Sequence, residues 1–221
     1  MDIMQAIAER HSVRKYEEKP LPEDVKESLQ KAVEECNEEA GLHIQLVTDE
    51  PEAFGSAMAH FSSFKGVTNY FALVGPDNSD LDEAMGYYGE KLVLEAQMLG
   101  LNSCWVALTF KKVPGAYDIS PGEKLSAVIA LGYGKTQGRQ HKSKNIHTVS
   151  NLSDDSPEWF RKGVEAALLA PTAMNQQRFR FELMGSGVRA SAGVGIYAKL
   201  DLGIVKYHFE VGSGKDSSIW L

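Results

Sequence analysis

The chain has 221 residues, of which 43% are hydrophobic and 24% are charged, and this composition excludes a disordered tail, a collagen and a coiled coil. Its 23 basic and 30 acidic residues give a net charge of −7, which argues against a broad surface for binding nucleic acid. The sequence holds two cysteines without zinc-type spacing and no stretch near the ~20 apolar residues that span a bilayer, so we expect a cytoplasmic protein with no metal and no membrane contact.

The first part of the chain predicts a succession of helices and strands. Apolar residues at helical spacing predict helices over residues 2–9, from Pro22 to a stop at Gly41, and from Leu81 to Leu99. Alternation or short apolar runs predict strands over residues 42–46, 71–74, 103–108 and 126–131.

The later part begins with a polar connector over residues 135–156, which collects the basic residues Lys135, Arg139, Lys142 and Lys144. A helix is predicted to start at Pro157 and to be broken at Pro171. Strands over residues 179–183 and 192–197 and a helix from Asp201 to Val211 complete the prediction. The whole pattern indicates an α+β fold in which a central mixed β-sheet is flanked by helices.

A shift of the sequence by 135 positions aligns its second helix and first strand with a later helix and strand. Pro22 then meets Pro157, Glu23 meets Glu158, and Ile44 meets Phe179 without a gap. We therefore predict a first unit over residues 1–150 and a shortened second copy over residues 151–221, two unequal pseudo-symmetric halves packed as one compact domain. Chance similarity is the alternative, because Pro-Glu helix starts are common.

The two copies differ between helix and strand. The first has the acidic residues 35–40, predicted to form a loop, where the second has the uncharged residues 170–175. An acidic loop would repel an anion or an electron-rich ring edge, whereas an uncharged one offers hydrogen-bonding groups. We expect the two copies to have different roles.

Two segments carry residue types suited to an anionic cofactor. Arg10, Ser12 and Arg14 alternate, so an extended chain would place both guanidinium groups and the hydroxyl on one side, where they could bind phosphate. A solvated basic turn is the alternative. The loop of residues 170–177 carries amides at Asn175 and Gln177 that could meet the edge of a flat heterocycle, or it could be a helix-ending turn with polar filler.

Together these motifs, with Gly100–Trp105 and Leu131–Gly134, resemble the nitroreductase-like FMN flavoprotein family. The resemblance implies that the first motif holds the flavin phosphate and that the second contacts the isoalloxazine ring. The implied FMN contacts are Arg10, His11, Ser12 and Arg14 in the first motif, Lys142 and Lys144 in the connector, and Pro171, Thr172, Ala173, Asn175 and Gln177 in the second.

The resemblance also implies a reaction, hydride transfer from NAD(P)H through FMN to a nitroaromatic, a quinone or a similar small acceptor. Members of the family usually carry the ring loop after the second helix and bind flavin between two subunits. Here that loop lies in the second copy, so the chain resembles the tandem, pseudo-dimeric branch, with one FMN per chain in a monomer or homodimer. A non-catalytic FMN-binding sensor or carrier, and a phosphate-binding module without flavin, are the alternatives.

Other residues are interpreted as packing groups. Cys104 is expected to be a small buried hydrophobe without a basic neighbour, and His208 a packed or surface histidine. Tyr87 and Tyr88 more often pack than wall a pocket. Gly86 and Gly89 either mark close helix packing or only weaken the helix. No side chain is predicted to act as an acid or base.

Overall fold

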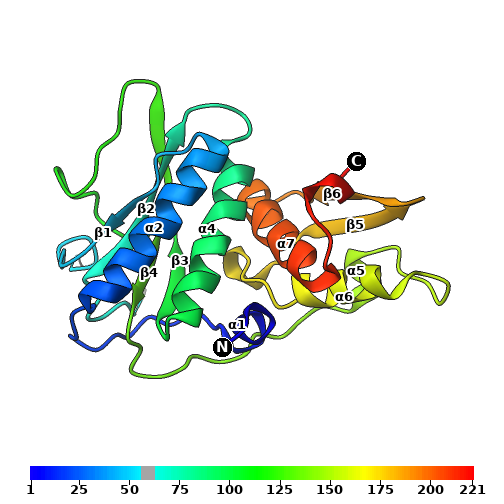
Figure 1. Ribbon diagram of the computed structural model, residues 1–221, viewed down its shortest axis with the longest axis horizontal. Coiled ribbons are helices and arrows are strands. Elements are labelled where there is room, and N and C mark those ends of the chain that lie inside the picture. Colours follow the sequence, from blue (N-terminus) through cyan, green and yellow to red (C-terminus); the bar gives the residue numbers. More distant parts are fainter. Residues whose placement is uncertain (56–62) are drawn as a thin grey trace. The chain divides into compact units, whose positions relative to one another are not determined.

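A computed structural model describes residues 1–55 and 63–221, which form two compact units (Figure 1). Unit 1 comprises residues 1–9, 82–91 and 140–221, and unit 2 comprises residues 10–81 and 92–139. The long helix α4 (Leu81–Met98) supplies residues to both units. Among the described residues, no helix is long and apolar enough to cross a membrane.

Unit 2 is built on a four-stranded sheet in the order β1-β2-β4-β3. Its strands are β1 (Gln45–Val47), β2 (Asn69–Pro76), β3 (Asn102–Val106) and β4 (Glu123–Gly132). All three strand pairs are antiparallel, with Phe71 opposite Ile129 and Trp105 opposite Ile129 on the other side of β4. Residues of β2 and the second half of β4 are buried almost throughout, because the sheet forms the core of this unit.

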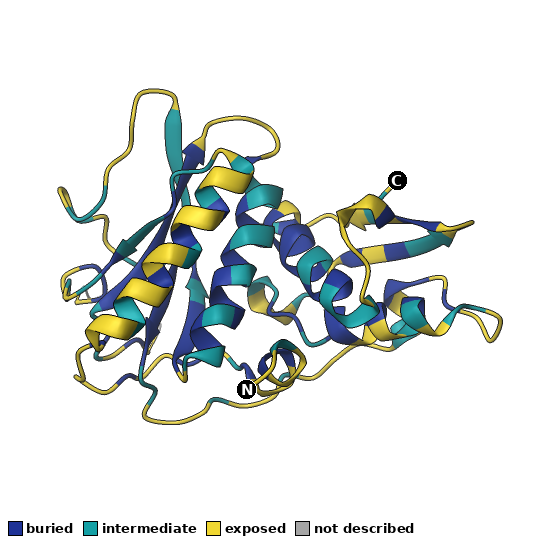
Figure 2. Ribbon diagram, viewed as in Figure 1, coloured by how far each residue is buried: buried dark blue, intermediate teal, exposed yellow. Residues whose placement is uncertain are grey.

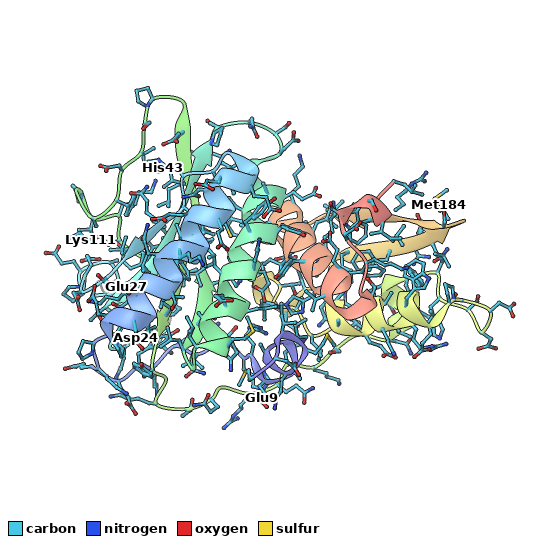
Figure 3. The ribbon with its side chains drawn as sticks, viewed as in Figure 1. Glu9, Asp24, Glu27, His43, Lys111 and Met184 are labelled. Atoms are coloured by element: carbon cyan, nitrogen blue, oxygen red, sulfur yellow. The ribbon has the colours of Figure 1, made fainter. Side chains whose placement is uncertain are left out.

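Helix α2 (Glu23–Ala40) shows how closely the sequence dictates local structure. Pro22 precedes its first turn, acidic residues lie in that turn, and Gly41 ends it in a left-handed conformation with a φ of 62°. Its buried side, Leu29, Val33 and Cys36, recurs at helical spacing. Figures 2 and 3 show the opposite, exposed side, where Asp24 and Glu27 lie.

Unit 1 contains helices and a hairpin. Its helices are α1 (Ile3–Glu9), α5 (Ile146–Val149), α6 (Glu158–Ala167) and α7 (Ala198–Ser213), with short 3-10 turns at Ala173–Asn175 and Ser217–Ile219. Strands β5 (Phe179–Met184) and β6 (Gly187–Ala192) pair antiparallel. The core of the unit is aromatic: Phe209 of α7 lies 5.8 Å from Phe160, 4.8 Å from Phe181 and 5.2 Å from Trp220, between ring centroids.

Glycines bring α7 against the part of α4 that belongs to unit 1. A Cβ atom on Gly86 would lie 2.0 Å from the carbonyl oxygen of Leu200, and one on Gly203 would lie 1.9 Å from that of Glu83. Backbone therefore touches backbone at this crossing, so of the two alternatives for Gly86 the structure shows close helix packing.

The α+β fold is confirmed, and four local expectations are corrected. The second hairpin strand is β6 at 187–192 and not 192–197, because the turn at Gly185, with a φ of 64°, starts it earlier. Residues 35–40 are the last turns of α2 and not a loop, since nothing before Gly41 interrupts the helix. The connector contains α5, capped by the side chain of Asn145. Within residues 1–55 and 63–221 the strand pairs are antiparallel instead of mixed, and parallel pairing is limited to isolated bridges such as Ser12 with Ser103.

Candidate functional site

The segment of residues 10–16 in unit 2 is fixed by its backbone. Val13 N donates to Ser103 O at 3.0 Å, Tyr16 N donates to Lys65 O at 2.9 Å, and Lys65 N donates to Arg14 O at 2.9 Å. The Tyr16 ring is buried, and its hydroxyl donates to Val13 O at 2.7 Å. Backbone hydrogen bonds to Ser103 and to Lys65 thus hold the segment in an extended conformation, as its alternating pattern predicts.

Arg10, Ser12 and Arg14 all act on the thiol of Cys104 on β3. Burial raises the pKa of that thiol, and Arg14, a hydrogen bond with Ser12, and Arg10 each act to lower it. Cys104 is buried as expected, but the expectation that it has no basic neighbour is wrong, because the pairing of Ser12 with Ser103 brings the arginines beside it. Two guanidinium groups and a hydroxyl at alternate positions of one extended segment are a suitable donor set for a phosphate.

A second segment of unit 2, residues 134–139, lies against the first. A Cβ atom on Gly138, whose φ is 75°, would lie 2.7 Å from the Cβ of His11 and 3.2 Å from Ser12 O. Asn102 fixes the same segment, accepting from Gly134 N at 2.9 Å. Arg139 follows Gly138 directly, so its backbone is close to the arginine-serine segment, a position that sequence reasoning left unassigned.

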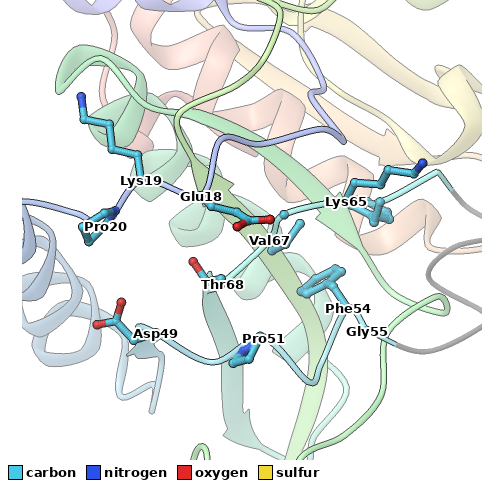
Figure 4. Close-up of a pocket in the computed structure, with 12 residues that line it drawn as sticks. Glu18, Lys19, Pro20, Asp49, Pro51, Phe54, Gly55, Lys65, Val67 and Thr68 are labelled. Carbon is cyan, nitrogen blue, oxygen red and sulfur yellow. The ribbon is translucent and has the colours of Figure 1, made fainter.

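A cavity of about 680 Å³ in unit 2 adjoins this segment through Lys65, the backbone partner of Arg14 and Tyr16. Figure 4 shows its lining, which comes from residues 18–20, 49–55 and 64–68. Its polar groups include the carboxylates of Glu18 and Asp49 and the hydroxyl of Thr68, and none of the predicted FMN contacts lines it. Within the described residues, no group of histidine, cysteine and carboxylate side chains could hold a metal ion.

The predicted ring loop in unit 1 has an uncommon backbone. Met174, Asn175 and Gln177 have φ values of 50°, 53° and 45°, in the left-handed region that L residues seldom adopt. Each such residue costs of the order of 1–3 kcal/mol, so other contacts must stabilise the loop. Met174 and Asn175 are exposed, whereas Pro171 and Gln177 are buried.

Side chains within the loop and from the connector supply part of that support. Gln177 donates its amide to Lys142 O at 2.9 Å and to Asn175 Oδ1 at 2.7 Å, and its own backbone N–H donates to Thr172 Oγ1 at 3.0 Å. Lys144 Nζ donates to the carbonyls of Gln176 at 2.7 Å and Gln177 at 3.0 Å. The structure therefore brings Lys142 and Lys144 together with the predicted ring loop.

Asp201 of α7 provides a further support that sequence reasoning missed. It is 1% exposed, and its carboxylate accepts from Ala173 N at 2.9 Å and from Gln176 Nε2 at 2.8 Å. Burial raises the pKa of Asp201 from 3.8 to about 6, although these two hydrogen bonds act in the opposite direction. The sequence signal was weak, since an acidic residue in the first turn of a helix is ordinary.

The remaining candidates pack inside unit 1. His208 is fully buried, with Nε2 2.8 Å from Glu90 Oε1 and Nδ1 3.1 Å from Ala166 O. Tyr87 donates to Glu210 at 2.6 Å and its ring packs against those of Tyr88 and Tyr207. The expected packing roles of these residues are confirmed.

Comparison with known proteins gives the family. Residues 2–213 match the family described as "Putative TM nitroreductase". The chain belongs to this family. The resemblance expected from its motifs is thereby confirmed. None of the curated proteins matches the chain.

Solved structures of nitroreductase-family proteins share the fold. A "putative nitroreductase" from Thermotoga maritima has a TM-score of 0.69 and 23% identity, covering 96% of this chain and 83% of that one. A "putative nitroreductase in complex with fmn" from Desulfovibrio desulfuricans has a TM-score of 0.54 and 17% identity, covering 71% and 99%. A "Putative NADH Oxidase" from Clostridium acetobutylicum has a TM-score of 0.52 and 16% identity, covering 69% and 99%. At these identities the similarity shows the nitroreductase fold.

Proposed function

We propose that this nitroreductase-family protein is an FMN-dependent oxidoreductase that passes hydride from NAD(P)H to a nitroaromatic, a quinone or a similar small acceptor. The observation that carries the proposal is the backbone-fixed extended segment of residues 10–16, which keeps Arg10, Ser12 and Arg14 at alternate positions beside β3. FMN, when bound, supplies the hydride chemistry, and the protein supplies binding and electrostatics.

The arginine-serine segment is suited to bind the phosphate. Its backbone is already fixed by the bonds to Ser103 and Lys65, so little ordering is needed when an anion binds. Arginine side chains stay charged and bind phosphate oxygens in a forked geometry. We add Arg139 to this set, because Gly138 lies directly against His11 and Ser12.

The loop of residues 171–177 keeps its implied contact with the isoalloxazine ring as a separate proposal. Within it, the amides of Asn175 and Gln177 both bond Lys142 O and each other, but Asn175 is exposed whereas Gln177 is buried. We therefore assign the polar ring contact to Asn175 and treat Pro171, Thr172, Ala173 and Gln177 as the frame around it. An amide N–H aimed at the pyrimidine edge of a flavin stabilises negative charge there.

The role that we propose for Lys144 differs from the phosphate contact that the family resemblance implies. The ammonium of Lys144 bonds two loop carbonyls, so we propose that it braces the loop instead of binding phosphate. Lys142 contributes its carbonyl to the same brace, while its side chain keeps the implied phosphate contact as a prediction.

The test compares Arg14→Ala with Lys15→Ala. Both residues are exposed cations, and in an extended segment neighbouring side chains point to opposite sides. A lost charge-assisted contact is worth about 1.5–3 kcal/mol, so Arg14→Ala should weaken FMN binding by roughly 10- to 150-fold. Lys15→Ala should bind as the wild type, and both variants should unfold at the wild-type temperature. Equal effects from the two variants would count against the assigned phosphate site.

Turnover is tested with the visible spectrum of the purified protein. We expect one FMN per chain and bleaching of its absorption by NADH or NADPH. Bleaching by dithionite alone would favour the non-catalytic sensor or carrier, and a colourless protein that gains no colour with FMN would contradict flavin binding altogether.

A further inference from the structure

Asp201 grips the 171–177 loop on both sides of its uncommon backbone. Its Oδ1 accepts from Ala173 N at 2.9 Å, and its Oδ2 accepts from Gln176 Nε2 at 2.8 Å. The two residues between these contacts, Met174 and Asn175, have left-handed backbone at φ values of 50° and 53°. One buried carboxylate therefore spans two of the three strained residues of the loop.

The side chain of Gln176 extends this grip to a second segment of unit 1. Its amide also donates to Ile196 O at 2.8 Å, so both of its N–H bonds are in use. A Cβ atom on Gly195 would lie 2.6 Å from Gln176 Oε1, and the amide fits there because this residue is a glycine. The side-chain amide of Gln176 is thus held in one orientation by Asp201, Ile196 O and the close approach of Gly195.

We propose that Asp201 is the positioning residue of the 171–177 loop and that, through the loop, it sets the orientation in which Asn175 meets a flavin ring. The second half of this inference rests on the proposed function. Asp201 does not touch the ring in this scheme, and it acts by holding Ala173 and Gln176 on either side of Asn175.

An amide cannot replace the carboxylate here. In Asp201→Asn one terminal atom becomes an NH₂ group, which faces either the N–H of Ala173 or the amide N–H of Gln176. Gln176 cannot compensate by rotating its amide, since its oxygen would then face Ile196 O. One support of the loop is therefore lost with almost no change in volume.

The matched control is Glu210→Gln on the same helix. Glu210 is also a buried carboxylate with two donors, Tyr87 Oη and Trp220 Nε1, each at 2.6 Å. Its substitution makes the same isosteric change in unit 1 without touching the loop. The full-length FMN-loaded protein is used for every variant, and Gln176→Met removes the grip from the loop side should Asp201→Asn fail to fold.

Two measurements are made, amide hydrogen exchange over residues 173–177 and the midpoint potential with the absorption spectrum of bound FMN. We expect Asp201→Asn or Gln176→Met to speed exchange in the loop by roughly 10- to 100-fold and to shift the flavin potential, with neither change in Glu210→Gln. Wild-type exchange in both loop variants, or equal acceleration in Glu210→Gln, would overturn the assignment. Faster exchange with an unchanged flavin potential would overturn its role toward the ring.

Failure of the proposed function gives a different result. If the wild-type protein takes up no FMN, the oxidoreductase proposal and the ring half of this inference are both overturned. The exchange measurement on the same preparation still decides whether Asp201 holds the loop.

Discussion

The two segments assigned to FMN are held in place in opposite ways. Residues 10–16 are fixed by backbone hydrogen bonds to Ser103 and Lys65, and the exposed side chains of Ser12 and Arg14 are not needed for those bonds. Residues 171–177 are fixed largely by side chains, with Asp201 and Gln177 each making two or more bonds to hold them. The two segments should therefore differ in which side-chain substitutions they tolerate.

A backbone-held segment does not depend on its exposed side chains, so substitution of Ser12 or Arg14 should change binding more than stability. A side-chain-held loop in a strained conformation has little such freedom, because most of its polar groups already have a structural use. In the ring loop, Asn175 is the exposed amide that can serve both purposes.

The largest expected effect is a dependence of the free energy of unfolding on pH, caused by Asp201, which holds the loop of residues 171–177. Because the pKa of Asp201 is raised from 3.8 to about 6, the folded state binds more protons than the unfolded state between these values. The free energy of unfolding should therefore fall as pH rises from about 4 to 6, by about 3 kcal/mol, the value of a shift of about two pH units. Urea unfolding at several pH values should show this loss as the difference between the wild type and Asp201→Asn, because the other carboxylates, such as Glu123 and Asp216 with their lowered pKa values, are common to both. Parallel profiles would contradict the assignment.

Removing one backbone hydrogen bond from the segment of residues 10–16 should lower the free energy of unfolding by about 1–3 kcal/mol. Lys65→Pro removes the N–H that donates to Arg14 O, and FMN affinity should fall with stability because the phosphate-binding side chains lose their support. Lys65→Ala keeps the N–H and should stay within about 0.5 kcal/mol of the wild type. Chemical unfolding and flavin titration check both variants, and equal behaviour of the two would show that backbone pairing is not what fixes the segment.

The smallest effect, about 1 kcal/mol, should separate Asn175→Gly from Asn175→Ala. Both remove the amide and should retain FMN while shifting its potential, but glycine accepts the φ of 53° that alanine resists. Asn175→Gly should therefore unfold at a higher denaturant concentration than Asn175→Ala. A wild-type flavin potential in both variants would remove Asn175 from the ring contact.

Sequence reasoning succeeded where the determinants are local. Pro22 and Gly41 mark the limits of α2 because a proline and a left-handed glycine act on the residues beside them. It failed at β6, whose small residues have little strand pattern and which is positioned by pairing with β5 and by Leu221 against Gly187. Sequence patterns do not reveal contacts between distant parts of the chain, and such contacts position β6.

The candidate site shows the same limit. The alternation of Arg10, Ser12 and Arg14 is visible in the sequence, but Cys104, whose pKa they lower, lies some 90 residues later and is brought near by the bridge of Ser12 to Ser103. Asp201 is separated from Ala173 by 28 residues and carries no motif. The residues that hold a site in place are thus harder to find than the residues that face a ligand.

The division of α4 has a consequence for how the protein is made. Every residue of unit 2 has left the ribosome once residue 139 has, whereas unit 1 needs residues 1–9 and 82–91 together with residues 140–221. Since domains fold as units during synthesis, unit 2 can acquire its sheet first. The part of α4 around Gly86 then stays exposed until Gly203 has been synthesised and α7 can pack against it.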